Sequence, residues 1–103
     1  MKTKVIADMI YKILKDNNVN FKEFYVLSRK EWGMPQDSAD FHMLVVVDNG
    51  IDLCDETYNI YDLLYPIYDD FEIEIGVTVK NEDGFKTSPT SREFVGIGVH
   101  YVA

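Results

Sequence analysis

The chain has 103 residues, of which 47% are hydrophobic and 14% aromatic, and its formal net charge is −8 at pH 7. This length predicts one domain over residues 1–103, and the composition predicts a folded globule rather than a disordered tail. The negative charge argues against a general nucleic-acid-binding protein, which needs a basic face.

The charge is unevenly distributed along the chain. Residues 1–30 contain seven Lys or Arg against three Asp or Glu, whereas residues 31–103 contain three against fifteen. The simplest interpretation is a basic helix attached to an acidic body. The alternative is that Arg29 and Lys30 bind phosphates while the acidic part binds a cation or a basic partner.

The sequence offers no candidate for a membrane-spanning segment, because no apolar stretch approaches the ~20 residues that cross a bilayer. Residues 1–18 are interrupted by charge throughout, so they do not read as a signal peptide. Cys54 is the single cysteine, which excludes an internal disulfide. We therefore expect a cytoplasmic protein that makes no membrane contact.

The N-terminal third predicts a helix followed by a strand. Residues 3–16 carry apolar side chains in one continuous stripe, which is typical of an amphipathic helix. Residues 21–27 are rich in β-formers and predict the first strand. Residues 30–39 contain glycine and proline and predict a loop or broken turn. Within it, Trp32 is expected to pack against the core, with stacking on a base as the alternative.

The middle of the chain predicts a central strand and a second helix. Residues 40–47 end in a continuous apolar run, which favours a strand covered on both faces. Residues 48–50 predict a turn. Residues 55–68 predict a helix in which Pro66 must cause a kink or a restart, because proline lacks the backbone donor.

The C-terminal third begins with a cleanly alternating segment. Residues 71–80 predict a third strand whose polar face carries Glu72 and Glu74. Residues 81–87 predict a loop, Ser88 opens a short helix, and the last residues form an extended tail. The order of elements predicts an α/β (α+β) two-layer domain in which helices pack on a small mixed sheet.

A candidate site lies where the first predicted strand ends and the second begins. Ser28 and Arg29 form a small polar turn that suits phosphate binding. Asp40 and His42 are two residues apart on the second strand, so their side chains are expected to share one face. Taken singly, Asp40 reads as a turn residue and His42 as a structural histidine. Together the four residues predict a phosphate-binding turn beside a metal-binding pair.

These residues resemble the small stand-alone, or minimal, nucleotidyltransferase-domain proteins of the DNA polymerase β-like superfamily. That family has a Gly-Ser-Arg turn and then, about ten residues later, an Asp-x-Asp pair that opens a strand ending in aliphatic residues. The turn here is Leu27-Ser28-Arg29, and the pair is Asp40-Phe41-His42, followed by MLVVV. The terminal segment SPTSREFVGIGVHYV is also similar to the family's closing segment.

The resemblance implies a nucleotidyltransferase fold and a metal-dependent enzyme. Such an enzyme transfers a nucleoside monophosphate from a nucleoside triphosphate to a hydroxyl of a partner protein or small molecule. Ser28 and Arg29 would hold the phosphates, and Asp40 and His42 would hold a divalent metal, Mg²⁺ or Mn²⁺. The resemblance also implies a HEPN-type helical toxin protein as a partner, with this chain as its antitoxin.

The family's third acid would be Glu72 or Glu74, and the sequence does not choose between them. Two other positions depart from the family pattern. Leu27 replaces a glycine and adds a side chain where phosphate should approach. His42 replaces a carboxylate with an imidazole, which suits zinc or copper better than magnesium. These departures motivate an alternative: a catalytically inactive nucleotidyltransferase-fold binding module or antitoxin-like partner protein.

Overall fold

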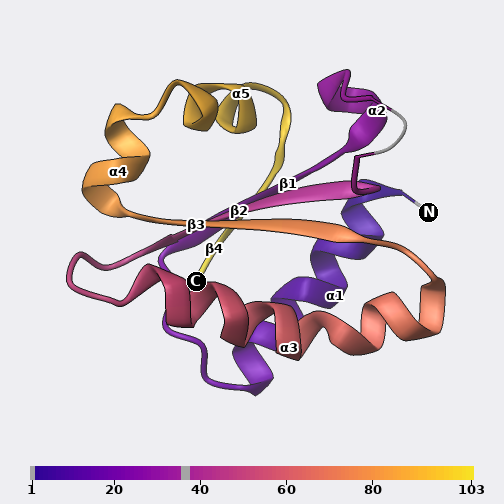
Figure 1. Ribbon diagram of the computed structural model, residues 1–103, viewed down its shortest axis with the longest axis horizontal. Helices are drawn as coiled ribbons and strands as arrows, with labels where there is room; N and C mark the ends of the chain where they lie inside the picture. The colour runs from indigo at the N-terminus through magenta and orange to yellow at the C-terminus, as the bar shows by residue number, and fades with distance from the viewer. Residues whose placement is uncertain (1, 36–37) are drawn as a thin grey trace.

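The computed structural model describes residues 2–35 and 38–103. Within these residues a four-stranded mixed sheet has the strand order β3-β2-β1-β4. β1 is antiparallel to β2 and to β4, and β2 is parallel to β3, so β3 and β4 form the edges (Figure 1). The strands are β1 (Glu23–Ser28), β2 (Phe41–Val47), β3 (Ile75–Asn81) and β4 (Val99–Val102).

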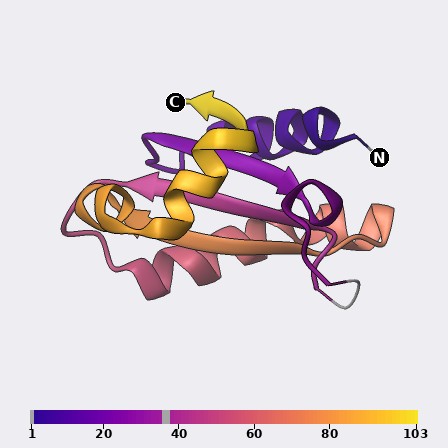
Figure 2. The same ribbon diagram turned by 90° about the horizontal axis from the view of Figure 1, so that it is seen from above.

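Helices lie on both faces of the sheet (Figures 1 and 2). One face is covered by the two long helices α1 (Thr3–Asp16) and α3 (Leu53–Phe71). In the described part of the chain, the other face is covered by three short helices, α2 (Arg29–Trp32), α4 (Glu82–Thr87) and α5 (Pro89–Ile97). No helix among the described residues is long and apolar enough to cross a membrane.

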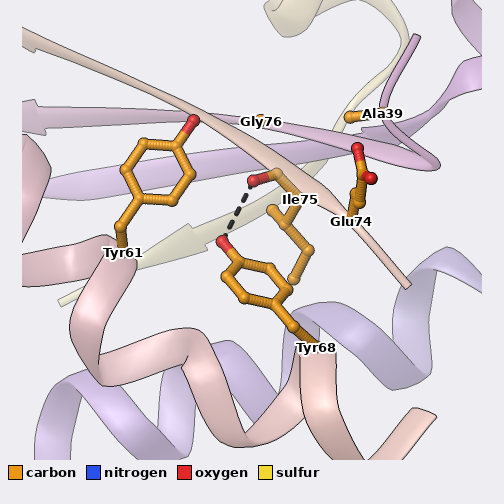
Figure 3. A pocket seen from close by; sticks show the side chains of 6 residues that line it. All are labelled: Ala39, Tyr61, Tyr68, Glu74, Ile75 and Gly76. Carbon is orange, nitrogen blue, oxygen red and sulfur yellow. Dashed lines mark hydrogen bonds between the residues drawn. The ribbon is translucent and has the colours of Figure 1, made fainter. Parts of the chain in front are cut away.

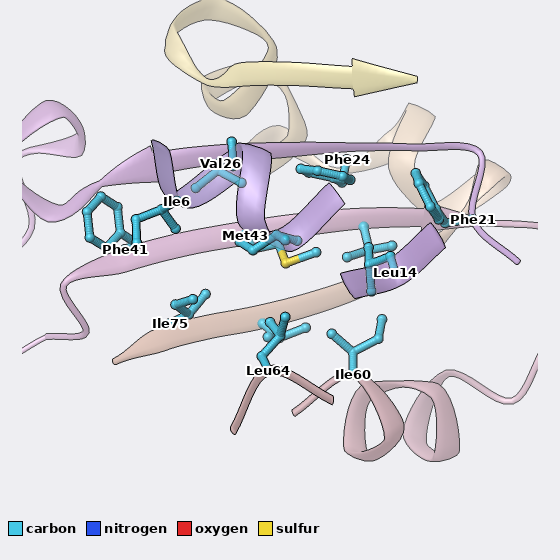
Figure 4. Close-up of a cluster of buried hydrophobic side chains, with 14 of the residues drawn as sticks. Ile6, Leu14, Phe21, Phe24, Val26, Phe41, Met43, Ile60, Leu64 and Ile75 are labelled. Carbon is cyan, nitrogen blue, oxygen red and sulfur yellow. The ribbon is translucent and has the colours of Figure 1, made fainter. Parts of the chain in front are cut away.

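The main core lies between the sheet and the two long helices (Figure 4). Alternation along β2 sends every second side chain into this core, and α1 and α3 contribute their apolar stripes. Burying each large aliphatic side chain stabilises the fold by about 1.5–3 kcal/mol. The fully buried side chains of this main core include Ile6, Ile10, Leu14, Phe24, Met43, Ile60 and Leu64.

A second, smaller cluster lies on the opposite face, beneath α2 and α5. Leu27 and Leu44 are completely buried there, and Phe94 from α5 packs onto them together with Tyr25. β2 is thus covered on both faces, as its apolar run predicts. The α/β (α+β) class, the mixed sheet and the helices packed on it are confirmed. The predicted two layers are three, because short helices also cover the second face of the sheet.

The predicted boundary between the second helix and the third strand is wrong. α3 begins two residues early, capped by Asp52, and runs through Pro66 to Phe71. Buried Leu64 and Ile67 anchor the helix on both sides of the proline, so packing holds it together despite the missing backbone donor. β3 therefore starts only at Ile75.

Two predicted loops contain short helices. In the first, Ser28 caps α2, and its side chain accepts a hydrogen bond from the Glu31 backbone N–H. In the second, the Asn81 side chain accepts from the Gly84 N–H at 2.7 Å and opens α4. The predicted extended tail becomes β4 by pairing with β1. Helix capping thus orders the two predicted loops, and pairing with β1 orders the tail, although the apolar pattern of these segments predicts neither.

Candidate functional site

Three of the residues predicted to form the site meet at the end of β1. Ser28, Arg29 and Asp40 line a pocket of about 310 Å³ together with Thr3, Lys30, Glu31, Phe41 and Ile73. The Arg29 backbone N–H donates to the Asp40 carbonyl at 2.9 Å, which ties the turn to the start of β2. Arg29 and Asp40 also form an ion pair, with Nη1 and Oδ1 3.7 Å apart. The predicted nearness of the turn and the aspartate is therefore observed.

The donors of the Ser28 turn are already engaged inside the chain. The Ser28 N–H donates to Glu31 Oε1 at 2.9 Å, and the Thr3 hydroxyl donates to the same oxygen at 2.7 Å. These two hydrogen bonds, the one from Thr3 above all, lower the pKa of the Glu31 carboxyl. The Glu31 carboxylate thus already accepts the hydrogen bond of the Ser28 N–H, the donor that a bound phosphate would need.

Asp40 lies just before β2, and its carboxylate faces the start of β3. Asp40 Oδ2 accepts from the Glu74 backbone N–H at 2.9 Å, while Oδ1 faces Arg29. Both oxygens therefore have protein partners. Because Asp40 precedes the first residue of the strand, the alternation of side chains along β2 does not fix its direction.

His42 lies in different surroundings, on the sheet face covered by α2 and α5. Its ring meets the edge of Trp32 with centroids 5.0 Å apart. Its Nε2 is buried and has no hydrogen-bond partner among residues 2–35 and 38–103. Burial lowers the pKa of His42, partly opposed by a hydrogen bond with the Ala39 backbone. The imidazole is accordingly neutral at pH 7 and sits in an aromatic setting.

Apolar side chains fill the space beside His42. Leu27 pairs directly with His42 across β1 and β2 and is completely buried. Trp32 is partly buried, and its ring and the Phe94 ring are T-shaped with centroids 5.0 Å apart, which confirms the predicted packing against the core. Leu27, which stands where the resembled family has a glycine, is thus part of a hydrophobic cluster.

The two candidate third acids do not lie on β3, which corrects the prediction of a polar strand face. Glu72 ends α3 in a left-handed conformation with φ 53°, and Glu74 precedes the first residue of β3. The β3 residue that pairs with His42 is Gly76. A Cβ at Gly76 would lie 3.2 Å from His42 Nδ1, so this position carries no ligand and has little room for one.

Comparison with known proteins identifies the fold. No protein-family model matches the sequence, and no curated protein matches it. The structure is similar to the crystal structure of a putative nucleotidyltransferase from Sulfolobus solfataricus, with a TM-score of 0.58 and 16% sequence identity, over 84% of this chain and 74% of that chain. The chain has a nucleotidyltransferase fold.

The residues of this nucleotidyltransferase-fold chain do not fit the predicted Mg²⁺ or Mn²⁺ site. Magnesium requires several oxygen ligands in octahedral geometry. Within the described ranges, no three His, Cys, Asp or Glu side chains are grouped so that they could hold a metal ion. Asp40 is engaged by Arg29 and the Glu74 amide, and His42 offers a nitrogen packed against Trp32.

A second pocket, of about 250 Å³, lies between α3 and β3 and was missed by sequence reasoning (Figure 3). The Tyr68 hydroxyl donates to the Ile75 carbonyl at 3.1 Å, and the Val77 N–H donates to the Tyr61 hydroxyl at 2.9 Å. The lining is completed by Ala39, Glu74 and Gly76. The sequence carries one indication of this pocket: Tyr61 and Tyr68 are seven residues apart and therefore lie on one face of the helix.

The phenol groups of this pocket are held in place by hydrogen bonds to β3, and that of Tyr68 stays protonated. Burial, with smaller contributions from Tyr61 and the Glu74 carboxylate, raises the pKa of Tyr68 to about 12. Both hydroxyls contact the edge of β3, so the two rings are fixed at both ends. The tyrosines therefore present rigid aromatic walls next to a carboxylate.

Proposed function

We propose that this nucleotidyltransferase-fold protein is a binding module for a partner protein and does not itself transfer nucleotides. The observation that carries the proposal is that His42 packs against Trp32. The resemblance aligns His42 with the second metal-binding acid of the minimal nucleotidyltransferases. The neighbours of His42 across the sheet are Leu27 and Gly76, neither of which supplies an oxygen ligand. Metal-dependent phosphoryl chemistry relies on carboxylates that hold the ion against the triphosphate.

The chemistry of the surface favours a basic partner. Residues 31–79 contain no Lys or Arg, so the body of the molecule is strongly acidic. Such a surface repels phosphate-rich nucleic acid and attracts a protein that presents Lys and Arg. The resemblance to minimal nucleotidyltransferases implies a HEPN-type helical toxin as this partner, with the present chain as its antitoxin.

A second candidate function is metal-dependent transfer of a nucleoside monophosphate from a nucleoside triphosphate. It is favoured by the pocket that Ser28, Arg29 and Lys30 share with Asp40. In this reading the basic side chains hold phosphates, Asp40 helps to hold the metal, and Glu31 leaves the Ser28 amide when a nucleotide arrives.

Isothermal titration calorimetry with ATP, with and without Mg²⁺ or Mn²⁺, separates the two functions. We expect no metal-dependent binding by the wild-type protein, since the metal ligands are incomplete. Metal-dependent binding that Asp40→Ala abolishes would contradict the binding-module proposal and support transfer. Asp83→Ala is the matched control, because Asp83 is an exposed aspartate on α4.

A further inference from the structure

The pocket between α3 and β3 has two aromatic walls and one ionised side chain (Figure 3). The Tyr61 and Tyr68 rings come from α3, and their centroids are 6.5 Å apart with planes inclined at 44°. Glu74 lies on the far side of the pocket from Tyr61, just before β3. Gly76 and Ala39 add little bulk, which leaves the space between rings and carboxylate open.

The charge around this pocket is negative. Glu74 is the charged member of the lining. The nearby Asp40 carboxylate, which accepts a hydrogen bond from the Glu74 backbone N–H, is paired with Arg29 and adds little to this charge. α3 contains no Lys or Arg, and β3 contains only Lys80 near its far end. An anion would meet repulsion here, whereas a cation would meet ring faces and a carboxylate, both of which attract it.

We propose that this pocket binds the guanidinium group of an arginine side chain presented by the partner protein. The proposal rests on the proposed function as a binding module and names its anchor point. A planar guanidinium stacks on tyrosine rings and can donate two hydrogen bonds to one carboxylate. The fixed rings reduce the ordering that binding requires.

The surface next to the pocket favours a polypeptide over a small free amine. Tyr65 is 63% exposed, and its ring and that of Tyr68 are T-shaped with centroids 6.4 Å apart, so Tyr65 extends the aromatic surface outward. Tyr58, 68% exposed, continues this surface two turns earlier along α3, and Asp62 and Asp69 are exposed on the same helix. Exposed tyrosines with acidic neighbours suit a partner whose arginine is flanked by further contacts.

The test uses two synthetic nine-residue peptides that are identical except for the central residue. One carries arginine and the other citrulline, which has the same shape without the charge; the flanking residues are alanine and one lysine at each end. Binding is followed by the NMR amide shifts of the ¹⁵N-labelled protein. We expect the arginine peptide to shift the amides of Gly76 and Val77 and to bind about tenfold more tightly than the citrulline peptide.

Two matched variants locate the binding. Glu74→Gln removes the pocket carboxylate and is expected to weaken the arginine peptide about fivefold. Glu72→Gln makes the same charge change two residues away, outside the lining, and is expected to change the affinity less than twofold. Both side chains are exposed, so both variants should fold. Tyr65→Ala tests the neighbouring surface and should weaken the peptide without moving the Gly76 shift.

Several results would overturn the proposal. Equal binding of the arginine and citrulline peptides would remove the role of the cation, and equal losses in both glutamate variants would indicate diffuse attraction. Ethylguanidinium that binds as tightly as the peptide would make the ligand a free small cation. Self-association in sedimentation that Glu74→Gln abolishes would make the occupant a second copy. None of these results depends on the ATP titration, so each proposal can fail alone.

Discussion

Glu31 gives the clearest case in which one side chain decides what a motif can do. Its carboxylate accepts hydrogen bonds from the Ser28 amide and the Thr3 hydroxyl, so it joins α1 to the turn after β1. The S-x-x-E spacing of a capping box is visible in the sequence. The same serine belongs to the Ser-Arg turn of the resemblance, and in the structure it forms the capping box.

The lowered pKa of Glu31 makes a prediction about acid stability. A carboxyl whose pKa is lower in the folded state contributes stability above its unfolded value near 4.5, and this contribution is lost as the pH falls through the folded pKa. Glu31→Gln should therefore be less stable than wild type at pH 7, and the difference should shrink below pH 4.5. Urea unfolding from pH 3 to 7 measures this; a difference independent of pH would contradict it.

The lowered pKa of His42 leads to a second prediction about pH and stability. Here the folded state favours the neutral form of the side chain, whereas for Glu31 it favours the charged form. Burial lowers the pKa of His42 below 6.5, so the unfolded chain takes up a proton before the folded protein does. Folding stability should fall as the pH drops below 6.5 and level off below the folded pKa. His42→Leu should remove this loss and be neutral or stabilising by up to about 1 kcal/mol, because Nε2 has no partner in the described structure. Thermal unfolding at pH 5 and 7.5 checks it; a variant that keeps the wild-type pH dependence would refute it.

At the scale of elements, periodicity located the strands and the first helix, but not every boundary. Residues 71–74 continue the alternation of β3, yet Phe71 still belongs to α3, and Glu72 turns the chain in a left-handed conformation. The packing of Ile67 and Tyr68 against the sheet decides this, and a short alternating pattern cannot reveal it. The same error put Glu72 and Glu74 on a strand face.

The candidate site was predictable only in part for the same reason. Ser28, Arg29 and Asp40 were expected to be neighbours and are, since Ser28 at the end of β1 pairs with Phe41 at the start of the antiparallel strand β2. The direction of Asp40 was not predictable, because it precedes β2 and takes its orientation from Arg29 and the Glu74 amide. The tyrosine pocket requires the parallel pairing of β2 with β3, which the sequence does not display.

The free edge of β3 provides a prediction at this scale. Tyr61 and Tyr68 satisfy backbone groups of Val77 and Ile75 that face away from β2, where the described part of the chain places no further strand. Tyr61→Phe and Tyr68→Phe should each lower the free energy of unfolding by about 1 kcal/mol. Tyr58→Phe is the control, since that ring is 68% exposed, and it should change stability little. Urea denaturation compares the three variants, and equal stabilities would mean that the edge needs no such cover.

The whole molecule combines a basic N-terminal segment with an acidic remainder, and this separation has a cost for the isolated chain. Residues 31–103 contain three Lys or Arg against fifteen Asp or Glu, a net charge of −12, and the +4 of residues 1–30 brings the chain to −8. Like charges at this density repel each other in the compact state, and salt screens them. We expect added NaCl, from about 10 to 300 mM, to raise the melting temperature by roughly 3 °C.

Neutralising part of the acidic surface should have the same effect as salt. Asp62→Asn with Asp69→Asn removes two exposed charges from α3, and this variant should melt higher than wild type at low salt and respond less to NaCl. Lys4→Gln is a contrasting control, because Lys4 pairs with Asp8 on α1 and its loss should not reduce the salt response. If the α3 variant and wild type respond equally to salt, repulsion within the acidic body does not limit stability. In that case, a partner that brings positive charge to α3 would not stabilise the protein by reducing charge repulsion.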